Sequence, residues 1–206
     1  GCALPTRQLV HADIYDDFVA RVKAIIGQFK VGDPMDPTVM VGPVINKAAV
    51  ERISGMFDRA KADNAATFLL GGKRCGGDLA DGNFIEPTLI VDADPEHEIC
   101  QVEIFGPAVV VMKFHDEDEA VAIANNSEYG LAAYIQSNDL QRVHRLSERL
   151  NAGGVYNNGG FQINPHTPFG GVGISGFGKE GGKAGIDEFL HYKTVTIGVG
   201  APIFPK

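Results

Sequence analysis

The residue types that could do chemistry gather at the two ends of this sequence. Residues 168–182 read Pro-Phe-Gly-Gly-Val-Gly-Ile-Ser-Gly-Phe-Gly-Lys-Glu-Gly-Gly, and a cysteine, Cys2, follows the first residue. So many glycines indicate a backbone that bends sharply or approaches another group closely. An aromatic residue at one end and a charged pair at the other are not typical of a flexible linker. We expect this glycine-rich run (residues 168–182) to pack against a partner.

The glycine-rich run matches two phosphate-binding patterns incompletely. Residues 171–176 satisfy GxGxxG, which binds a dinucleotide only where it joins a strand to a helix. Pro165 and Pro168 precede it, and prolines are not compatible with a central strand. Residues 173–180 approach the P-loop pattern, but Glu180 stands where a Ser or Thr should bind magnesium. Neither pattern therefore predicts phosphate binding.

A cysteine thiolate can act as a nucleophile or bind a metal. The three cysteines, Cys2, Cys75 and Cys100, have no CxxC spacing, so no zinc, other metal or redox site is predicted. Cys75 lies in a glycine-rich turn, and Cys100 is expected to be a small core residue. The six histidines are scattered and predict no site. By itself, a lone Cys2 would be expected to be inert.

Composition limits the class of protein. The 206 residues are 44% hydrophobic and can form a sizeable core. A net charge of −8 argues against a nucleic acid or an anionic membrane as partner. No apolar stretch reaches the about 18 residues of a spanning helix, and no signal segment opens the chain. We expect a cytoplasmic protein and, because the sequence does not begin with Met, a piece of a longer one.

Hydrophobic periodicity predicts an α/β fold, with a mostly parallel sheet, crossover helices on both faces and a C-terminal edge strand. Pro87 is expected to place its strand at an edge or a bulge. Strands and helices alternate over residues 108–156, which indicates parallel strands joined by right-handed crossover connections. Two helices are predicted to begin after the N-cap residues Asp13 and Asn46. Three more are predicted over residues 116–125, 139–150 and 183–190. The predicted strands cover 67–70, 84–91, 108–112, 131–135, 154–156 and 193–197.

Several segments, in order and spacing, resemble the catalytic half of the aldehyde dehydrogenases. They are residues 103–107 (Glu-Ile-Phe-Gly-Pro), 126–132 (Asn-Ser-Glu-Tyr-Gly-Leu-Ala) and the glycine-rich run. Two positions depart from the family pattern: Gly173 stands where Lys or Arg is usual, and Lys179 where Arg is common. The resemblance implies a catalytic domain over 1–190, and a strand and tail of the oligomerisation region over 191–206. It also implies that an N-terminal NAD-binding domain is absent from this chain.

The resemblance implies roles for individual residues. Cys2 stands at the position of the family's nucleophile, which attacks the aldehyde to form a thiohemiacetal and then a thioester. Glu103 would accept hydrogen bonds from the nicotinamide ribose hydroxyls of NAD or NADP, and Phe105 would pack against the nicotinamide. The alternatives without a functional role are a surface carboxylate for Glu103 and a core side chain for Phe105.

The remaining implied residues surround the substrate. Phe169 would line the floor of the site, and Asn158 would brace the loops, although an ordinary turn role is the alternative and Asn157 could replace it. Gly170 and Gly171 would support the site. The substrate mouth would be formed by Phe161, Gln162 and Ile163.

The function implied is oxidation of a small-molecule aldehyde to a carboxylic acid. The family's general base, oxyanion-hole asparagine and cofactor domain all precede the nucleophile, so the isolated chain is expected to be inactive. The alternatives are an acylating, coenzyme A-dependent dehydrogenase and a non-catalytic interaction module. Pairing of 193–197 with another copy would give a homo-oligomer.

Overall fold

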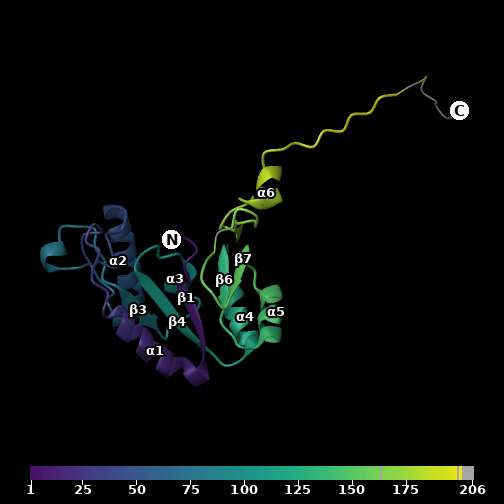
Figure 1. Cartoon of the computed structure of the whole chain (residues 1–206). Helices are drawn as coiled ribbons and strands as arrows, with labels where there is room; N and C mark the ends of the chain where they lie inside the picture. The colour runs from purple at the N-terminus through teal and green to yellow at the C-terminus, as the bar shows by residue number, and fades with distance from the viewer. Residues whose placement is uncertain (163, 199, 201–206) are drawn as a thin grey trace.

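The computed structural model describes residues 1–162, 164–198 and 200. Figure 1 shows two parts side by side, with a tail that extends away from both. The first part contains β1 Arg7–His11, α1 Ala12–Ile26, α2 Lys47–Ala62, β2 Thr67–Leu70, a short 3-10 helix Gly77–Leu79, β3 Thr88–Val91, α3 Glu98–Gln101 and β4 Ala108–Phe114. The second contains α4 Glu117–Asn125, β5 Tyr129–Gly130, β6 Ala132–Ile135, α5 Leu140–Arg149, β7 Gly154–Asn157, β8 Val172–Gly173 and α6 Gly182–Asp187.

The first part is built on a four-stranded sheet with the order β1-β4-β3-β2. β1, β4 and β3 are parallel, and β2 pairs antiparallel with β3 through an irregular register. Of the two positions predicted from Pro87, an edge or a bulge, the edge is wrong, because β3 lies between two strands and is fully buried. The irregularity in its pairing lies on β2, between Phe68 and Leu70. β3 begins at Thr88, so Pro87 precedes the ladder and need not donate to it.

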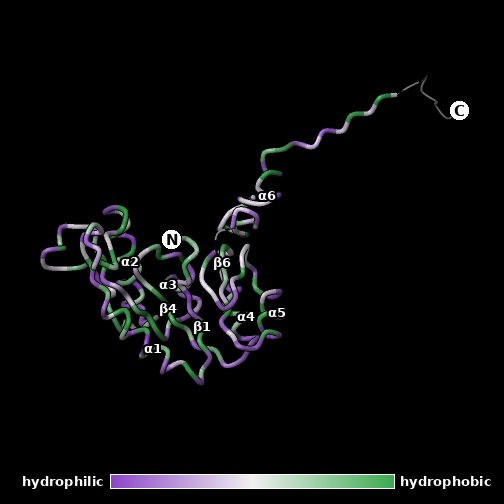
Figure 2. Tube along the Cα trace, in the orientation of Figure 1, coloured by the Kyte–Doolittle hydropathy of each residue, from purple (hydrophilic) through white to green (hydrophobic). Residues whose placement is uncertain are grey.

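Both faces of this sheet are covered, as expected for an α/β fold. On one face, Ile53 and Phe57 of α2 pack with Val110 of β4. On the other, Tyr15 of α1 packs with the next residue, Val111. The tube in Figure 2 is correspondingly green through most of β4, whereas α5 is largely purple.

Two helix starts show how local sequence sets the elements. Asn46 caps α2, as predicted, because its side chain accepts a hydrogen bond from Ala49 N. The predicted cap of α1, Asp13, is wrong. The N-cap is His11, two residues earlier, and its Nδ1 accepts from Asp13 N.

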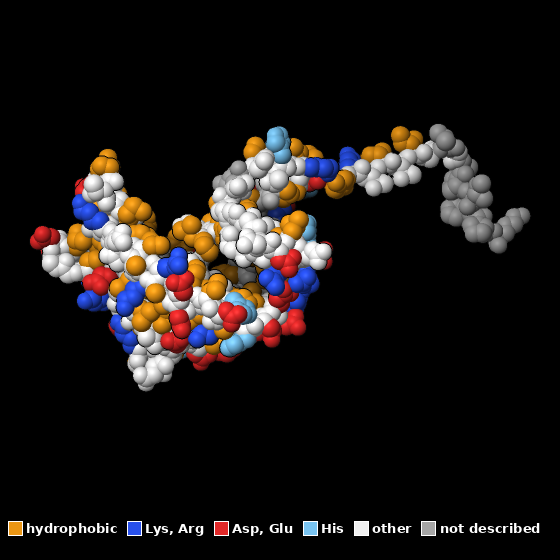
Figure 3. All heavy atoms as spheres, turned by 60° about the horizontal axis from the view of Figure 1, so that its bottom comes forward, with side chains coloured by type: hydrophobic (Ala, Val, Ile, Leu, Met, Phe, Trp, Pro, Cys, Tyr) orange, Lys and Arg blue, Asp and Glu red, His pale blue; other side chains and the backbone are white. Residues whose placement is uncertain are grey.

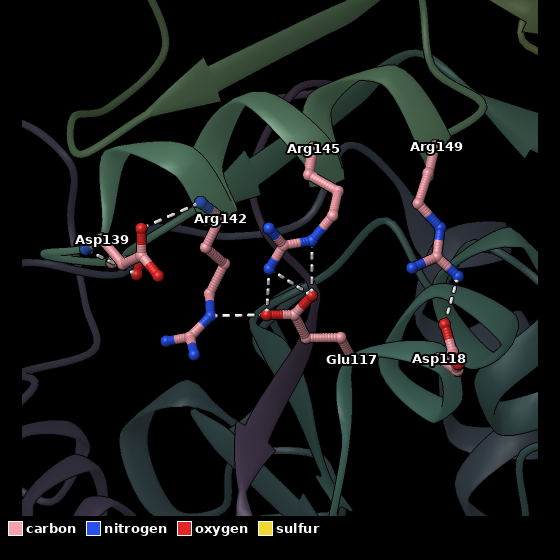
Figure 4. Close-up of polar contacts among 7 residues, drawn as sticks. Glu117, Asp118, Asp139, Arg142, Arg145 and Arg149 are labelled. Atoms are coloured by element: carbon pink, nitrogen blue, oxygen red, sulfur yellow. Dashed lines mark hydrogen bonds and ion pairs between the residues drawn. The ribbon is translucent and has the colours of Figure 1, made fainter.

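The second part holds two parallel strands, β6 and β7, joined by α5. β4 does not pair with β6 in the described part of the chain, so the predicted crossovers lead to two separate sheets. Ion pairs join α4 to α5: Glu117 contacts both Arg142 and Arg145, and Asp118 contacts Arg149 (Figure 4).

The chain beyond α6 runs away from both parts (Figure 1). The predicted strand at 193–197 is not formed: residues 191–198 are exposed and have no backbone hydrogen bonds to other described residues. A strand needs a neighbouring strand, and the single chain supplies none there. Within the described ranges, no helix has the length and apolar composition to cross a membrane.

Candidate active site

The glycine-rich run folds back on itself. Phe169 and Glu180 form an antiparallel bridge with two hydrogen bonds of 2.7 Å between their backbones. Between them, β8 pairs antiparallel with β5. α6 begins only at Gly182, so GxGxxG does not join a strand to a helix. The run therefore lacks the strand-to-helix turn that the dinucleotide fingerprint requires.

The run also packs tightly against the start of β7. A Cβ on Gly153 would lie 1.7 Å from Gly170 O, and a Cβ on Gly171 would lie 2.5 Å from Ser175 Cβ. The Lys179 ammonium donates to the Gly170 and Gly171 carbonyl oxygens at 3.0 and 2.8 Å. These glycines permit close backbone approach. The support of the site by Gly170 and Gly171 stays a prediction.

A chain of aromatic rings leads from this run toward the N-terminus. Phe169 contacts Phe161, Phe161 contacts Tyr156, and Tyr156 stacks on Tyr134, each with 5.4 Å between ring centroids. The Tyr134 hydroxyl donates to the carbonyl of Ala3, beside Cys2. Sequence reasoning missed both tyrosines, although they are register partners on β6 and β7.

Cys2 differs from the other two thiols in its surroundings. Cys2 is exposed, whereas Cys75 is half-buried and Cys100 is buried. Burial raises the pKa of the Cys75 thiol and raises that of Cys100 to about 11, so both stay protonated near neutral pH. Burial, followed by the nearby Tyr156 and Cys2, raises the pKa of Tyr134. The Tyr134 hydroxyl therefore remains a donor next to the Cys2 segment.

The segment carrying Glu103 and Phe105 is held by two side chains that sequence reasoning missed. Arg52 donates to the carbonyl oxygens of Glu103 and Ile104 at 3.2 and 2.6 Å. Glu103 N donates to the Tyr129 hydroxyl at 3.4 Å. Phe105 has a φ of 46° and is 56% exposed, so the alternative of a core phenylalanine is wrong. The alternative of a surface carboxylate for Glu103 stays open, because Glu103 is also exposed.

Asn158 joins the carboxyl ends of β6 and β7. Its side chain accepts from Ser137 N and donates to Ser137 O, both at 2.8 Å, and its own N–H donates to Ile135 O. Asn157 instead contacts Ser147 on α5. Of the two asparagines, Asn158 is thus the one that braces a loop, and its φ of 52° makes it a turn residue as well.

A groove of about 1820 Å³ between the two parts is lined by some of the predicted residues. Cys2, Glu103 and Phe161 all line it, and Figure 3 shows hydrophobic side chains around the hollow between the parts. Gln162 is exposed outside this lining, and Ile163 lies outside the described residues. Phe105, Phe169 and Asn158 are also outside the lining, although Phe169 is connected through Phe161. In the described part of the chain no cluster of three metal-ligating side chains occurs.

Comparison with known proteins shows the family of this chain. The model of the aldehyde dehydrogenase family matches residues 1–195. The chain belongs to the aldehyde dehydrogenase family. It is 40% identical over 195 residues to the chloroplastic betaine aldehyde dehydrogenase of Beta vulgaris, covering 95% of this chain and 39% of that protein. It is 39% identical to an NADP-dependent succinate-semialdehyde dehydrogenase of Deinococcus radiodurans, over 95% of this chain and 40% of that protein.

Solved aldehyde dehydrogenases share the fold. A betaine aldehyde dehydrogenase of Staphylococcus aureus in complex with NAD+ matches with a TM-score of 0.88 and 38% identity, over 93% of this chain and 38% of that one. HpcC of Thermus thermophilus matches with a TM-score of 0.90 and 40% identity, over 98% and 40%. The chain therefore spans about 40% of the length of these family members.

Proposed function

We propose that this chain is the thiol-bearing part of an NAD(P)-dependent aldehyde dehydrogenase that oxidises an aldehyde to a carboxylic acid. The observation that carries the proposal is the position of Cys2, exposed at the groove that Glu103 and Phe161 also line. The relatives act, by their names, on betaine aldehyde or on semialdehydes. A small aldehyde is accordingly the proposed substrate class.

The chemistry begins at the Cys2 sulfur. The thiolate attacks the carbonyl carbon, and the new S–C bond gives a thiohemiacetal. Loss of a hydride from that carbon leaves a thioester on Cys2, and water then cleaves the S–C bond to release the acid and the thiolate. The ring chain from Tyr134 to Phe169 begins at the Cys2 segment, where the Tyr134 hydroxyl donates to the Ala3 carbonyl.

NAD or NADP, when bound, supplies the hydride acceptor. Glu103 would hold the ribose hydroxyls, because a carboxylate accepts from two hydroxyls at once. Phe105 would cover one face of the ring. Arg52 and Tyr129 hold the backbone of this segment in place. The exposed, braced Glu103 and Phe105 fit such a group.

Thiol reactivity tests the role of Cys2. Chloroacetamide labelling followed by mass spectrometry should modify Cys2 at least tenfold faster than Cys75, because Cys2 is exposed whereas burial raises the pKa of the Cys75 thiol. The control for exposure alone is Cys2→Ser combined with Thr6→Cys, which places an exposed thiol nearby. Equal labelling rates for Cys2, Cys75 and the control thiol would favour a non-catalytic module.

A second measurement asks whether this chain alone oxidises an aldehyde. The purified 206-residue chain with NAD+ and betaine aldehyde should form no NADH, because the proposed general base and the cofactor domain belong to the rest of the protein. Robust NADH formation would contradict this. Acylating and hydrolytic chemistry would then be separated by whether coenzyme A is required.

A further inference from the structure

The turn that follows β7 contains the one Asn-Gly pair of the sequence, Asn158–Gly159. An asparagine amide is open to attack by the backbone nitrogen of the next residue. Glycine hinders this attack least, because it has no Cβ. Both residues of the pair are exposed to water. The pair therefore has the composition and the access of a site of spontaneous deamidation.

The nitrogen that would attack is accessible. Gly159 N donates no hydrogen bond to another described residue, whereas the Gly159 carbonyl oxygen accepts from Gln136 Nε2 at 3.2 Å. A Cβ on Gly159 would meet only Asn157 O, at 3.8 Å, and a Cβ on Gly160 would meet nothing within 4 Å. The surroundings of the Gly159 nitrogen are therefore open.

The amide that would be attacked is held in place. Asn158 Oδ1 accepts from Ser137 N, and Asn158 Nδ2 donates to Ser137 O, both at 2.8 Å. Asn158 N also donates to Ile135 O at 2.8 Å, which fixes the backbone of the same residue. An intramolecular reaction needs its two atoms in a near-attack arrangement, about 3–3.5 Å apart. While both Ser137 hydrogen bonds are made, the amide cannot turn freely toward the Gly159 nitrogen.

A second asparagine, Asn64, separates the effect of the glycine from that of exposure and backbone conformation. Like Asn158, it is exposed and has a φ of 52°, in the left-handed region that asparagine tolerates better than most residues. Asn64 is followed by Ala65 instead of glycine. The methyl group of Ala65 hinders attack by its nitrogen, so Asn158 should be the more reactive of the two.

We propose that Asn158 is a modification site: in the folded chain it converts without an enzyme to aspartate or isoaspartate, at a rate that the two Ser137 hydrogen bonds restrain. The Gly159 nitrogen loses its proton and bonds to Asn158 Cγ. The bond from Cγ to the amide nitrogen breaks, and ammonia leaves with that proton. Water then opens the cyclic imide at either of its carbonyl carbons. This inference does not depend on the proposed activity.

The product cannot keep the contacts of the amide. A carboxylate in place of the Asn158 amide still accepts from Ser137 N, but it has no donor for Ser137 O and places an oxygen against it. The isoaspartate form also adds a methylene group to the main chain. Phe161 lies just beyond and contacts Tyr156 and Phe169, each with 5.4 Å between ring centroids. Conversion should therefore loosen Phe161 as well as the connection between β6 and β7.

Incubation of the purified 206-residue chain tests the site. In mildly alkaline buffer, peptide mapping by mass spectrometry with fragmentation should find the acid form at Asn158 before it appears at Asn64 or Asn157. Gly159→Ala should slow the conversion about tenfold, because the added methyl group hinders the attack. Gly160→Ala is the matched control and should convert at the wild-type rate, since that residue takes no part in the reaction and has room for a Cβ.

Unfolding and melting measure the restraint and its loss. In urea, Asn158 should convert about tenfold faster than in the native chain, because the amide is released from Ser137 and turns freely. Asn158→Asp carries one product from the start and should lower Tm by about 2–4 °C, the loss expected for one hydrogen bond. Asn157→Asp is the control: it still accepts from the Ser147 hydroxyl and should change Tm less.

Several results would overturn the proposal. They are a first conversion at another asparagine, an unchanged rate in Gly159→Ala, and a native chain that keeps the Asn158 amide while the unfolded chain converts completely. Equal rates in the native and the unfolded chain would overturn the restraint by Ser137. Because the readouts are mass and Tm, the presence or absence of dehydrogenase activity would not affect them.

Discussion

The hydroxyl of Tyr134, on β6, donates a hydrogen bond to the backbone carbonyl of Ala3, which is 131 residues earlier in the sequence. This contact ties the Cys2 segment to the second part of the molecule. The same ring stacks on Tyr156 and so begins the aromatic chain that ends at Phe169. The position of the proposed nucleophile therefore depends on a side chain that does no chemistry itself.

Tyr134→Phe should lower the free energy of unfolding by about 0.5–1.5 kcal/mol, because it removes one hydrogen bond and keeps the ring stack. Urea denaturation measures this. Exchange at the Ala3 and Leu4 amides should also become faster. Tyr156→Phe is the matched control, since its hydroxyl makes no hydrogen bond with the described residues. An equal loss in both variants would contradict the role of the Ala3 contact.

Arg52→Ala should destabilise the chain by about 1–3 kcal/mol, because a charged donor is lost from two carbonyl oxygens. Hydrogen exchange at residues 103–105 should then accelerate. Arg21→Ala is the control: it breaks an exposed pair with Asp17 worth about 0.5 kcal/mol or less. Unchanged hydrogen exchange at residues 103–105 in Arg52→Ala would show that the Arg52 hydrogen bonds do not hold this segment.

Gly153→Ala should be strongly destabilising, by more than about 2 kcal/mol, because its Cβ would overlap the Gly170 carbonyl oxygen at 1.7 Å. Circular dichroism melting would report the loss. Gly160→Ala, where a Cβ meets nothing within 4 Å, should leave Tm nearly unchanged. Similar Tm values for the two variants would mean that the glycine-rich run does not lie against β7 this closely.

Glu117→Gln should remove part of the acid sensitivity of folding. Arg145, followed by Arg142, lowers the pKa of Glu117 below its ordinary value of 4.5. Because the folded-state pKa is depressed, the stabilisation is present above about pH 4.5 and is lost as pH falls through the lower, folded value. Tm measured from pH 6 downward should therefore fall less steeply in Glu117→Gln. Glu148→Gln, an exposed carboxylate outside these ion pairs, should follow the wild type.

Local patterns predicted most elements correctly. The stripe of Val50, Ile53 and Phe57 is buried on α2 as expected, and the apolar run of β4 is a central strand. These succeed because side chains three or four apart share a helix face, and a continuous apolar run requires cover on both faces. The edge position predicted from Pro87 failed because proline excludes a ladder position but does not say where the ladder begins.

The site divides in the same way. By its motifs, the sequence alone determined the family and singled out Cys2, Glu103, Phe105 and the glycine-rich run. Only the tertiary structure decided that Tyr134 connects Cys2 to Phe161 and Phe169, that Arg52 holds Glu103, and that Asn158 rather than Asn157 braces a loop.

The physical reason is the distance along the chain. Hydrophobic periodicity and motif spacing report contacts within a few residues, which set helices, strands and turns. The Tyr134 and Arg52 contacts join residues 131 and 51 positions apart. The Arg52 contact forms within the first part, whereas the Tyr134 contact forms only where the two parts meet. The placement of β1 and β6 in separate sheets is likewise a property of sheet order, which strand patterns leave open until strands are placed side by side.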